Sequence, residues 1–274
     1  MKPPQLRHDE GDKGMSQYLA AIWKCRYFWL SLVQMDLLSR YRRSLLGIGW
    51  SLLQPIGMTL VLCAVFATLF QKDVREYGPW LLIGLCFWNF IASTTQQGCQ
   101  CLLQGERYIR QHPAPLAIYP LRTVLGCTFH FAITLALVMV MRFVLIGFSG
   151  ISSFVGLIPA LAMLVIVGWS LAMLAGFVTA YFPDMQHLTE VGLQILFYGT
   201  PIIYPPEMLR GRGLGWIVDC NPLAAFVDLF REPLLNGVVP PFSQFIVAAL
   251  STIAIAGAAA FTVARLQKKI IFQL

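Results

Sequence analysis

The chain has 274 residues, of which 57% are hydrophobic and only 12% carry a formal charge. Soluble domains carry about 25% charged residues, so this composition excludes a soluble fold and indicates an integral membrane protein. The net charge of +7 does not indicate nucleic-acid binding, because the basic residues gather in segments expected on one side of a membrane, which is the pattern of an orientation signal.

The N-terminal segment is predicted in two parts. Residues 1–15 are polar and contain several Pro and Gly residues, which predicts a disordered cytoplasmic tail. Residues 16–39 mix Trp, Tyr and Leu with Lys24, Arg26 and Asp36, and these charges interrupt any spanning helix. We expect an amphipathic helix in the cytoplasmic interface. A soluble helix packed on a partner is the alternative.

Residues 40–274 are predicted to form a six-span membrane domain. Its first residues are Arg40, Tyr41, Arg42 and Arg43. They precede a 26-residue stretch, 45–70, without a charged side chain, which is long enough for a bilayer core of about 30 Å. Because arginines resist translocation, this end is expected in the cytoplasm.

Apolar runs predict five further spans. One begins at Trp80, and the others cover 121–148, 154–182, 188–203 and 242–266. Because the first span is expected to start in the cytoplasm, six spans leave both termini in the cytoplasm.

Three features inside these spans carry further expectations. The polar run 93–100 should face protein or water rather than lipid. His130 fits a hydrogen bond to a neighbouring helix better than a proton relay. Gly168, Ala172 and Gly176 should permit close helix packing.

Two connections have structure of their own. In the inside connection, Glu106 and Arg110 are spaced i, i+4 and predict one or two helical turns, followed by an extended Pro-rich stretch. Such a helix suits docking to another subunit, and a plain solvated loop is the alternative. In the outside region, Asn221 and Pro222 cap a helix that is too short to span. We expect that helix to be re-entrant or to lie flat on the outer leaflet.

The chain lacks the common motifs of nucleotide and metal chemistry. It contains no P-loop, and no His/Cys cluster with the spacing of a metal site, so we predict no metal, no cofactor and no catalytic residue in this chain. Most acidic residues lie in connections rather than in spans, which argues against a proton or ion relay. Transport driven by another subunit is the economical interpretation.

Aromatic residues crowd the first, second and fifth spans. The candidates for a channel lining are Phe66, Phe70, Phe87, Trp88, Phe197 and Tyr198. Sugar rings have apolar faces and polar edges, so aromatics mixed with Gln, Ser and Thr suit a glycan path. Core or lipid-facing positions are the alternative for each of these side chains.

Several short motifs occur together in one order. They are Arg40-Tyr41-Arg42-Arg43-Ser44-x-Leu46-Gly47-x2-Trp50-x3-Gln54-Pro55, Phe87-Trp88-Asn89-Phe90, Tyr108-Ile109-Arg110 followed by Ile118-Tyr119-Pro120, Phe182-Pro183-Asp184, Pro201-Ile202-Ile203-Tyr204-Pro205, and Asn221-Pro222-Leu223. This set resembles the permease subunits of type-2 ABC exporters of polysaccharides, which export O-antigen, capsule or teichoic acid chains.

The resemblance implies an all-α membrane fold with an N-terminal interface helix, a cytoplasmic coupling helix and re-entrant outside helices between spans 5 and 6. It implies a homodimer in the bacterial inner membrane that works with two copies of a separate ATPase subunit, which would hold ATP and Mg. The expected ATPase-coupling residues are Glu106, Arg107, Tyr108, Ile109, Arg110 and Asp184. The expected cargo is an undecaprenyl-linked polysaccharide.

The four residues 40–43 are candidates to guide the lipid headgroup, with anchoring to the lipid surface as the alternative. O-antigen is the first candidate substrate. Pro183 before Asp184 is closer to capsule exporters, so capsule and teichoic acid remain open. A drug or lipid exporter of the same superfamily is a further alternative, and a membrane-embedded lipid-modifying enzyme is a more distant one.

Overall fold

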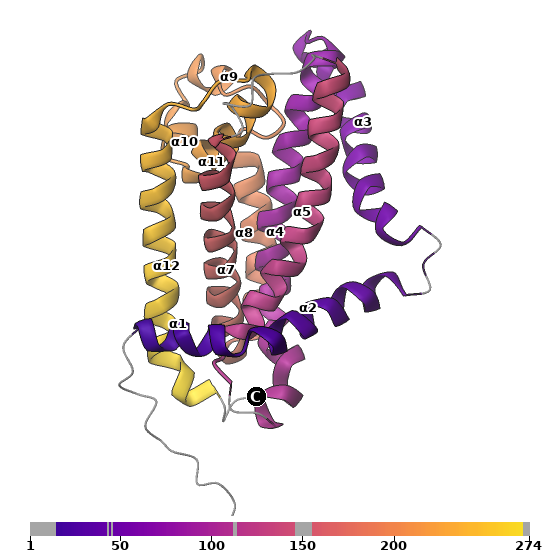
Figure 1. Ribbon diagram of the computed structural model, residues 1–274. Helices are drawn as coiled ribbons and strands as arrows, with labels where there is room; N and C mark the ends of the chain where they lie inside the picture. Colours follow the sequence, from indigo (N-terminus) through magenta and orange to yellow (C-terminus); the bar gives the residue numbers. More distant parts are fainter. Residues whose placement is uncertain (1–14, 43, 45, 112–113, 146–154, 271–274) are drawn as a thin grey trace, which may run out of the picture.

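The computed structural model of the protein describes residues 15–42, 44, 46–111, 114–145 and 155–270. Within these residues every regular element is a helix (Figure 1), which confirms the predicted all-α class. Of the predicted tail and arginine group, residues 1–14 and Arg43 lie outside the described residues.

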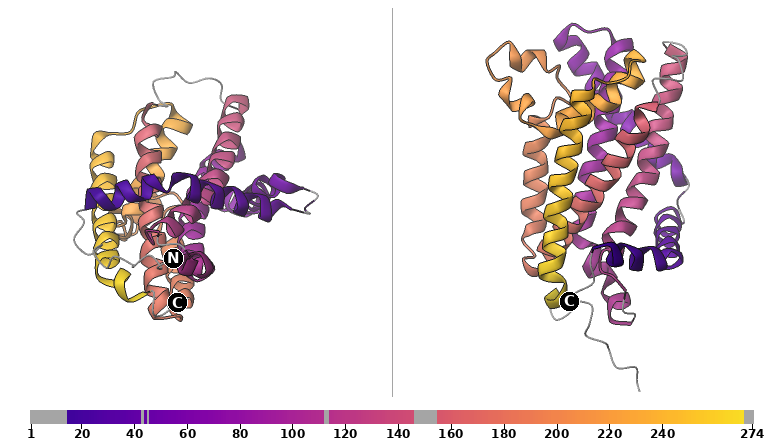
Figure 2. Two further views of the ribbon diagram at one scale, coloured as in Figure 1. Left: turned by 60° about the horizontal axis from the view of Figure 1, so that its bottom comes forward. Right: turned by 60° about the vertical axis from the view of Figure 1, so that its left-hand side comes forward.

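Helices α1 (Met15–Lys24) and α2 (Arg26–Tyr41) lie crosswise beneath the other helices, and α2 reaches out beyond them (Figure 2). The single helix expected over 16–39 is thus interrupted at Cys25, where the backbone leaves helical geometry with ψ at 15°. The break lets α1 and α2 follow the end of the bundle as two short helices.

The apolar side of α1 is fixed to the bundle. Ile22 is buried in a cluster with Ala117 and Ile118, which lie at the start of α5. Trp23 on α1 and Tyr27 at the start of α2 remain exposed, at 65% and 74% of their surface. One side of α1 therefore packs on the bundle, and the exposed aromatic side chains are of the kind that favours a membrane interface.

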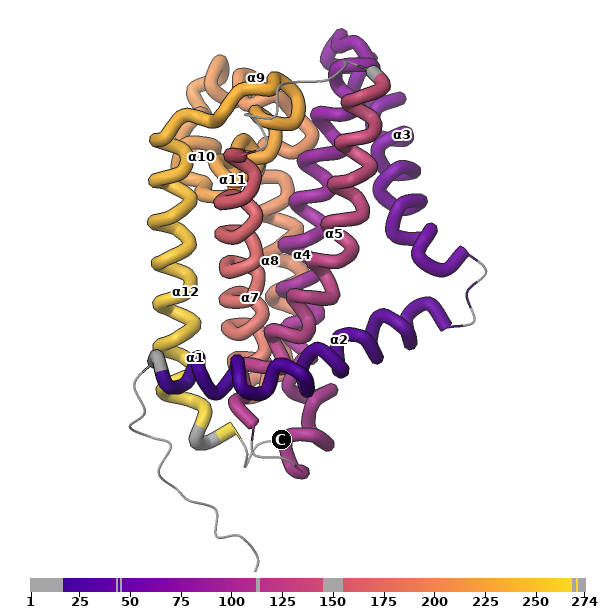
Figure 3. The backbone as a smooth tube through the Cα atoms, viewed as in Figure 1, coloured from indigo at the N-terminus to yellow at the C-terminus, as the bar shows by residue number. Residues whose placement is uncertain are grey.

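The remaining long helices stand side by side. They are α3 (Trp50–Phe70), α4 (Val74–Gln111), α5 (Ile118–Leu145), α7 (Leu157–Tyr181), α8 (Met185–Gly199) and α12 (Phe242–Ile270). A 3₁₀ turn, η2 (Gly47–Gly49), leads into α3. The chain reverses direction from each of these helices to the next, so α12 ends beside α1 (Figure 3).

Helix α4 is central and packs mainly against α5 and α7. A methyl group added to Gly98 would lie only 2.6 Å from Cα of Ala172, and one on Gly176 would lie 2.8 Å from the Gly98 carbonyl. The small residues therefore let α4 and α7 approach closely, which confirms the packing predicted for the fourth span.

Four helices in the described residues are long and apolar enough to cross a membrane. These segments are Gly47–Phe70, Ile118–Val144, Leu157–Tyr181 and Phe242–Gln267. The polar run 93–100 interrupts the apolar sequence of α4, although the helix itself is continuous, and α8 has only 15 residues. Both nevertheless pack within the bundle, since α4 contacts α3, α5, α7 and α8.

The segment between α8 and α12 forms a cap at the end opposite α1 and α2 (Figure 1). It contains α9 (Glu207–Arg210), α10 (Trp216–Asp219), α11 (Pro222–Arg231) and a π-helical turn, η3 (Glu232–Asn236). The Asn221 side chain accepts a hydrogen bond of 3.0 Å from the Leu223 amide, with Pro222 at the first helical position. The predicted cap of α11 is therefore confirmed.

Candidate functional site

Two adjoining cavities open where α2 meets the bundle, and together we call them the α2 groove. The larger has a volume of about 420 Å³ and is lined from α2, α3, α4 and α5, and the smaller has about 290 Å³. Arg40, Gln97 and His130 line both cavities, so the two are parts of one groove.

Arg40 is held at the groove by His130. Its guanidinium Nη1 donates to His130 Nε2 at 2.8 Å. On the other side of the ring, Nδ1 lies 2.9 Å from both the Tyr41 and Ser51 hydroxyl oxygens. A guanidinium can only donate, so Nε2 must accept and the ring proton belongs on Nδ1. The predicted hydrogen-bonding role of His130 is confirmed, and it joins α2, α3 and α5.

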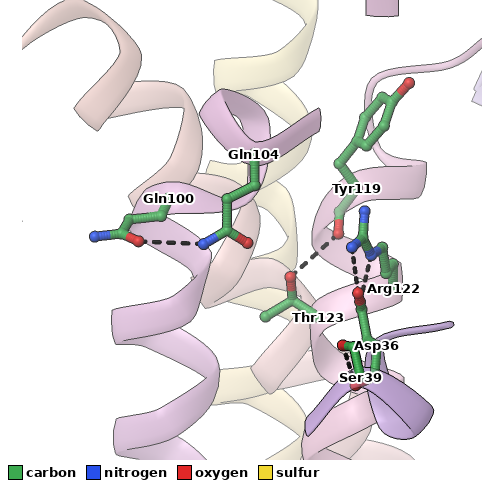
Figure 4. Close-up of polar contacts among 7 residues, drawn as sticks. All are labelled: Asp36, Ser39, Gln100, Gln104, Tyr119, Arg122 and Thr123. Carbon is green, nitrogen blue, oxygen red and sulfur yellow. Dashed lines mark hydrogen bonds and ion pairs between the residues drawn. The ribbon is translucent and has the colours of Figure 1, made fainter. Parts of the chain in front are cut away.

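An ion pair fixes the rest of α2 to the bundle. Arg122 donates from Nε to Oδ2 of Asp36 and from Nη2 to Oδ1, as Figure 4 shows. The pair is partly shielded, because the Arg122 side chain is 16% exposed and that of Asp36 41%. A two-point contact of this kind fixes orientation as well as distance. Sequence analysis missed it, since the partners are 86 residues apart.

Polar side chains of α4 form the opposite wall of the groove. Asn89, Ser93 and Gln97 line the larger cavity, and Gln97 and Gln104 line the smaller one. Gln104 donates to Gln100 at 3.2 Å (Figure 4). Polar groups in the run 93–100 therefore face a cavity, as the sequence predicts for polar side chains at membrane depth.

The predicted arginine group divides at the end of α2. Arg40 and Tyr41 line the groove. Arg42 is exposed, and its backbone amide donates to the Leu38 carbonyl where α2 ends. Only part of the group is therefore placed at a cavity.

The predicted coupling residues of the inside connection belong to the last turns of α4 rather than to a separate helix. Glu106 and Arg110 form an ion pair of 2.8 Å at the predicted i, i+4 spacing. Tyr108 contacts the ring of Phe28 on α2, with centroids 6.1 Å apart. This end of α4 projects past the level of α1 and α2 (Figure 1).

The other coupling candidates differ in exposure. Arg107 is exposed, and Ile109 is half-buried against a cluster that includes Leu116. Asp184 is exposed at the start of α8. Gln186, two residues later, accepts from Gln100, which ties this turn to α4.

None of the six predicted lining aromatics lines the α2 groove. Phe66 and Phe70 contact each other, with ring centroids 5.6 Å apart. Trp88 contacts Phe197, which contacts Tyr198. Tyr198 is 63% exposed, whereas Trp88 is buried. A glycan path along these aromatics stays a prediction.

Phe87, the sixth of these aromatics, lies in the core under the cap. Its ring centroid is 6.4 Å from that of Phe226 and 6.2 Å from that of Phe230. Only 1% of its surface is exposed in the single chain. The ring therefore fastens α11 to α4.

Arg231, on α11, is a buried cation that sequence analysis missed. It is 4% exposed and donates to the carbonyls of Pro201 and Ile202 at 2.7 and 3.0 Å. Its guanidinium stacks on Trp80, 3.6 Å from the ring centroid. Burial disfavours the charged form of a side chain, but a guanidinium stays protonated in proteins, so Arg231 is a buried cation. The signal was present in the sequence as one cation in an otherwise apolar helix face.

No group of His, Cys, Asp and Glu in the described part of the chain could hold a metal ion. The groove is lined by the Arg40 guanidinium, the His130 imidazole, hydroxyls and amides, which can form hydrogen bonds with a ligand.

Comparison with known proteins gives one family. The model of the ABC-2 type transporter family matches residues 27–235. The chain is similar to the O-antigen export system permease protein RfbA of Klebsiella pneumoniae, with 27% identity over 205 residues, 74% of this chain and 78% of the relative. It is also similar to RfbA of Myxococcus xanthus, with 20% identity over 79% and 84% of the two chains, and to the polysialic acid transport protein KpsM of Escherichia coli, with 20% over 74% and 80%.

Proposed function

The chain belongs to the ABC-2 type transporter family, and from this we propose that it is the membrane subunit of an ATP-driven exporter of lipid-linked polysaccharide. The observation that carries the proposal is its similarity, over about three quarters of each chain, to permeases named for O-antigen export. O-antigen is therefore the first candidate cargo. The likeness to a polysialic acid transport protein keeps capsular polysaccharide as the second.

The proposed arrangement has six spans, namely α3, α4, α5, α7, α8 and α12, in the bacterial inner membrane. The reversal of direction at each step supports it, as does the packing of α4 and α8 inside the bundle. The groove allows α4 to keep polar side chains away from lipid. The end with α1 and α2 would face the cytoplasm, since Arg40 and Arg42 lie there. Both termini would then be cytoplasmic.

In chain order, residues 1–15 would form the cytoplasmic tail, residues 16–39 the interface element and residues 40–274 the membrane domain. The cap between α8 and α12 would close the outer end. Helix α11 has only 10 residues, so it supports a re-entrant position rather than a span.

The chain would act as a homodimer with two separate ATPase subunits, which would bind ATP and Mg. Docking at Glu106–Arg110 and Asp184 is supported by the projection of α4 beyond α1 and α2. The contact of Tyr108 with Phe28 gives a mechanical route from that end to α2. Movement of α4 would thereby reach the groove, whose wall contains Arg40 at the other end of α2.

The α2 groove would receive the phosphate-bearing headgroup of the lipid carrier. Arg40 offers a guanidinium oriented by His130 at a cavity, and guanidinium groups bind phosphate oxygens at two points. Arg42 and Arg43 would add long-range attraction for anionic lipid.

The test is ATPase activity of the full chain purified with its ATPase subunit and returned to bilayers. Undecaprenyl-pyrophosphate-linked polysaccharide is expected to stimulate hydrolysis, and detergents or drug-like amphiphiles are not. Equal stimulation by simple amphiphiles would favour a drug or lipid exporter. If the two subunits do not associate, the proposal is wrong and a membrane-embedded enzyme becomes the better interpretation.

A further inference from the structure

One face of α4 carries a polar stripe made of Asn89, Ser93, Gln97, Gln100 and Gln104. At 3.6 residues per turn, these positions fall within an arc of about 80°. Fifteen residues separate the first from the last, a rise of about 22 Å. The stripe therefore runs along most of the hydrocarbon thickness of a membrane.

The opposite face of α4 is buried protein core. Phe87, Ile91, Gly98 and Leu102 lie about half a turn away from the stripe and are all buried against the bundle. Helix α4 thus has one side fixed by packing and one side that is polar. Neutral amides facing lipid over this length would leave their donors and acceptors unsatisfied.

The stripe faces the groove instead. Asn89, Ser93, Gln97 and Gln104 each line one or both cavities, and Asn89, Gln97 and Gln104 are exposed within the chain. Gln100 is half-buried and links the stripe to Gln186 of α8 by a hydrogen bond of 3.2 Å. Arg40 lines both cavities together with Gln97, the middle residue of the stripe, so stripe residues extend along α4 on both sides of this cation.

We infer that the polar stripe is a binding surface for the sugar chain, separate from the cation that meets the headgroup. This inference rests on the proposed function. Amides both donate and accept hydrogen bonds, as sugar hydroxyls do. The stripe has no formal charge, so each hydrogen-bonding contact is weak. Several such contacts are repeated along the helix axis. Repeated weak sites let a cargo bind and still move on.

The test uses the full chain with its ATPase subunit in bilayers and two probes. One is undecaprenyl-pyrophosphate-linked polysaccharide and the other is undecaprenyl pyrophosphate without sugar. Gln97→Leu is expected to raise the polysaccharide concentration for half-maximal ATPase stimulation about fivefold, the effect of one hydrogen bond. The response to the sugar-free probe should change by a smaller factor, because Arg40 rather than Gln97 would make the charge-assisted contact with the phosphate.

Gln96→Leu is the matched control. Gln96 is exposed and adjacent in sequence, but it lines neither cavity. Equal responses of the Gln96→Leu and Gln97→Leu proteins to polysaccharide would overturn the inference. If the unsubstituted protein itself shows no stimulation by polysaccharide, the proposed function fails first, so the two failures are distinguishable.

A crosslinking experiment tests the same surface without relying on turnover. The photoreactive residue p-benzoylphenylalanine is incorporated at position 97 or 96, and the polysaccharide probe carries radiolabelled sugars. Sugar label is expected on the chain from position 97 and not from position 96. Crosslinks from position 97 to a second copy of the chain, without sugar label, would mean that the stripe is a subunit contact and would overturn the inference.

Discussion

The arginines at the two ends of the bundle occupy opposite environments. Arg231, under the cap, is 4% exposed, and its guanidinium is occupied by two carbonyls and the face of Trp80. Arg40, at the α2 groove, is exposed and lines both cavities while His130 fixes one of its nitrogens. The comparison separates a cation that stabilises the fold from one that is oriented but still accessible to a ligand.

The surroundings of Arg231 explain why a cation is buried there. The chain leaves helical geometry after α8, and carbonyls at this break need donors because lipid supplies none. Asn221 donates to the Gly199 carbonyl, Arg231 to the next two free carbonyls, and Tyr77 to that of Ile203. Side chains from α4 and the cap thus replace the missing helical hydrogen bonds.

Arg231→Met should have the largest effect on stability. It keeps much of the side-chain volume but leaves the Pro201 and Ile202 carbonyls buried without donors. We expect a loss of about 3 kcal/mol in the free energy of unfolding, seen as a lower Tm in detergent. Arg210→Met is the control, because Arg210 pairs with Asp219 on the surface and should leave Tm unchanged. Equal Tm values for both variants would contradict the structural role of Arg231.

Gly84→Ala should disturb the same cluster without removing the charge. The added methyl would lie 2.6 Å from Nη2 of Arg231 and 3.3 Å from the Ile202 carbonyl oxygen. Since stacking and hydrogen bonds fix the guanidinium, we expect a loss of about 1–3 kcal/mol. Gly126→Ala on α5 is the control, because outside its own helical turn no atom lies within 4 Å of the added methyl. A Gly84→Ala protein as stable as the Gly126→Ala protein would mean that Arg231 is free to move.

Asp36→Asn should weaken the attachment of α2 to the bundle. It removes the charge that holds Arg122, while the fold of the bundle is left intact. Because the pair is partly exposed, we expect a loss of only about 1 kcal/mol in global stability. Hydrogen exchange should nevertheless accelerate in the peptide that covers α2. Glu106→Gln, which breaks an exposed pair on α4, serves as control and should leave α2 exchange unchanged.

At both ends, sequence predicted local features and missed contacts between distant segments. The apolar runs of α3, α5, α7 and α12 and the Asn221–Pro222 cap are local signals, and each appears in the structure. The ion pair of Asp36 with Arg122 and the contacts of Arg231 join distant segments, so no local pattern reports them. The predicted coupling residues Glu106–Arg110 were expected as separate helical turns, but α4 continues through Gly105, whose missing side chain leaves room for the Tyr119 ring, and contains them in its last turns.

Arg40→Gln should change stability least and ligand response most selectively. Arg40 is exposed and no buried carbonyl depends on it, so the free energy of unfolding should change by no more than about 0.5 kcal/mol. Stimulation of the ATPase by sugar-free undecaprenyl pyrophosphate should weaken about tenfold, because a charge-assisted contact is lost.

Arg42→Gln removes an equal charge two residues away, at an exposed turn that lines neither cavity. A weakening confined to Arg40→Gln would locate the phosphate in the groove, whereas equal weakening in both would favour general attraction to the lipid surface. No weakening in either would show that this end of α2 does not meet the headgroup.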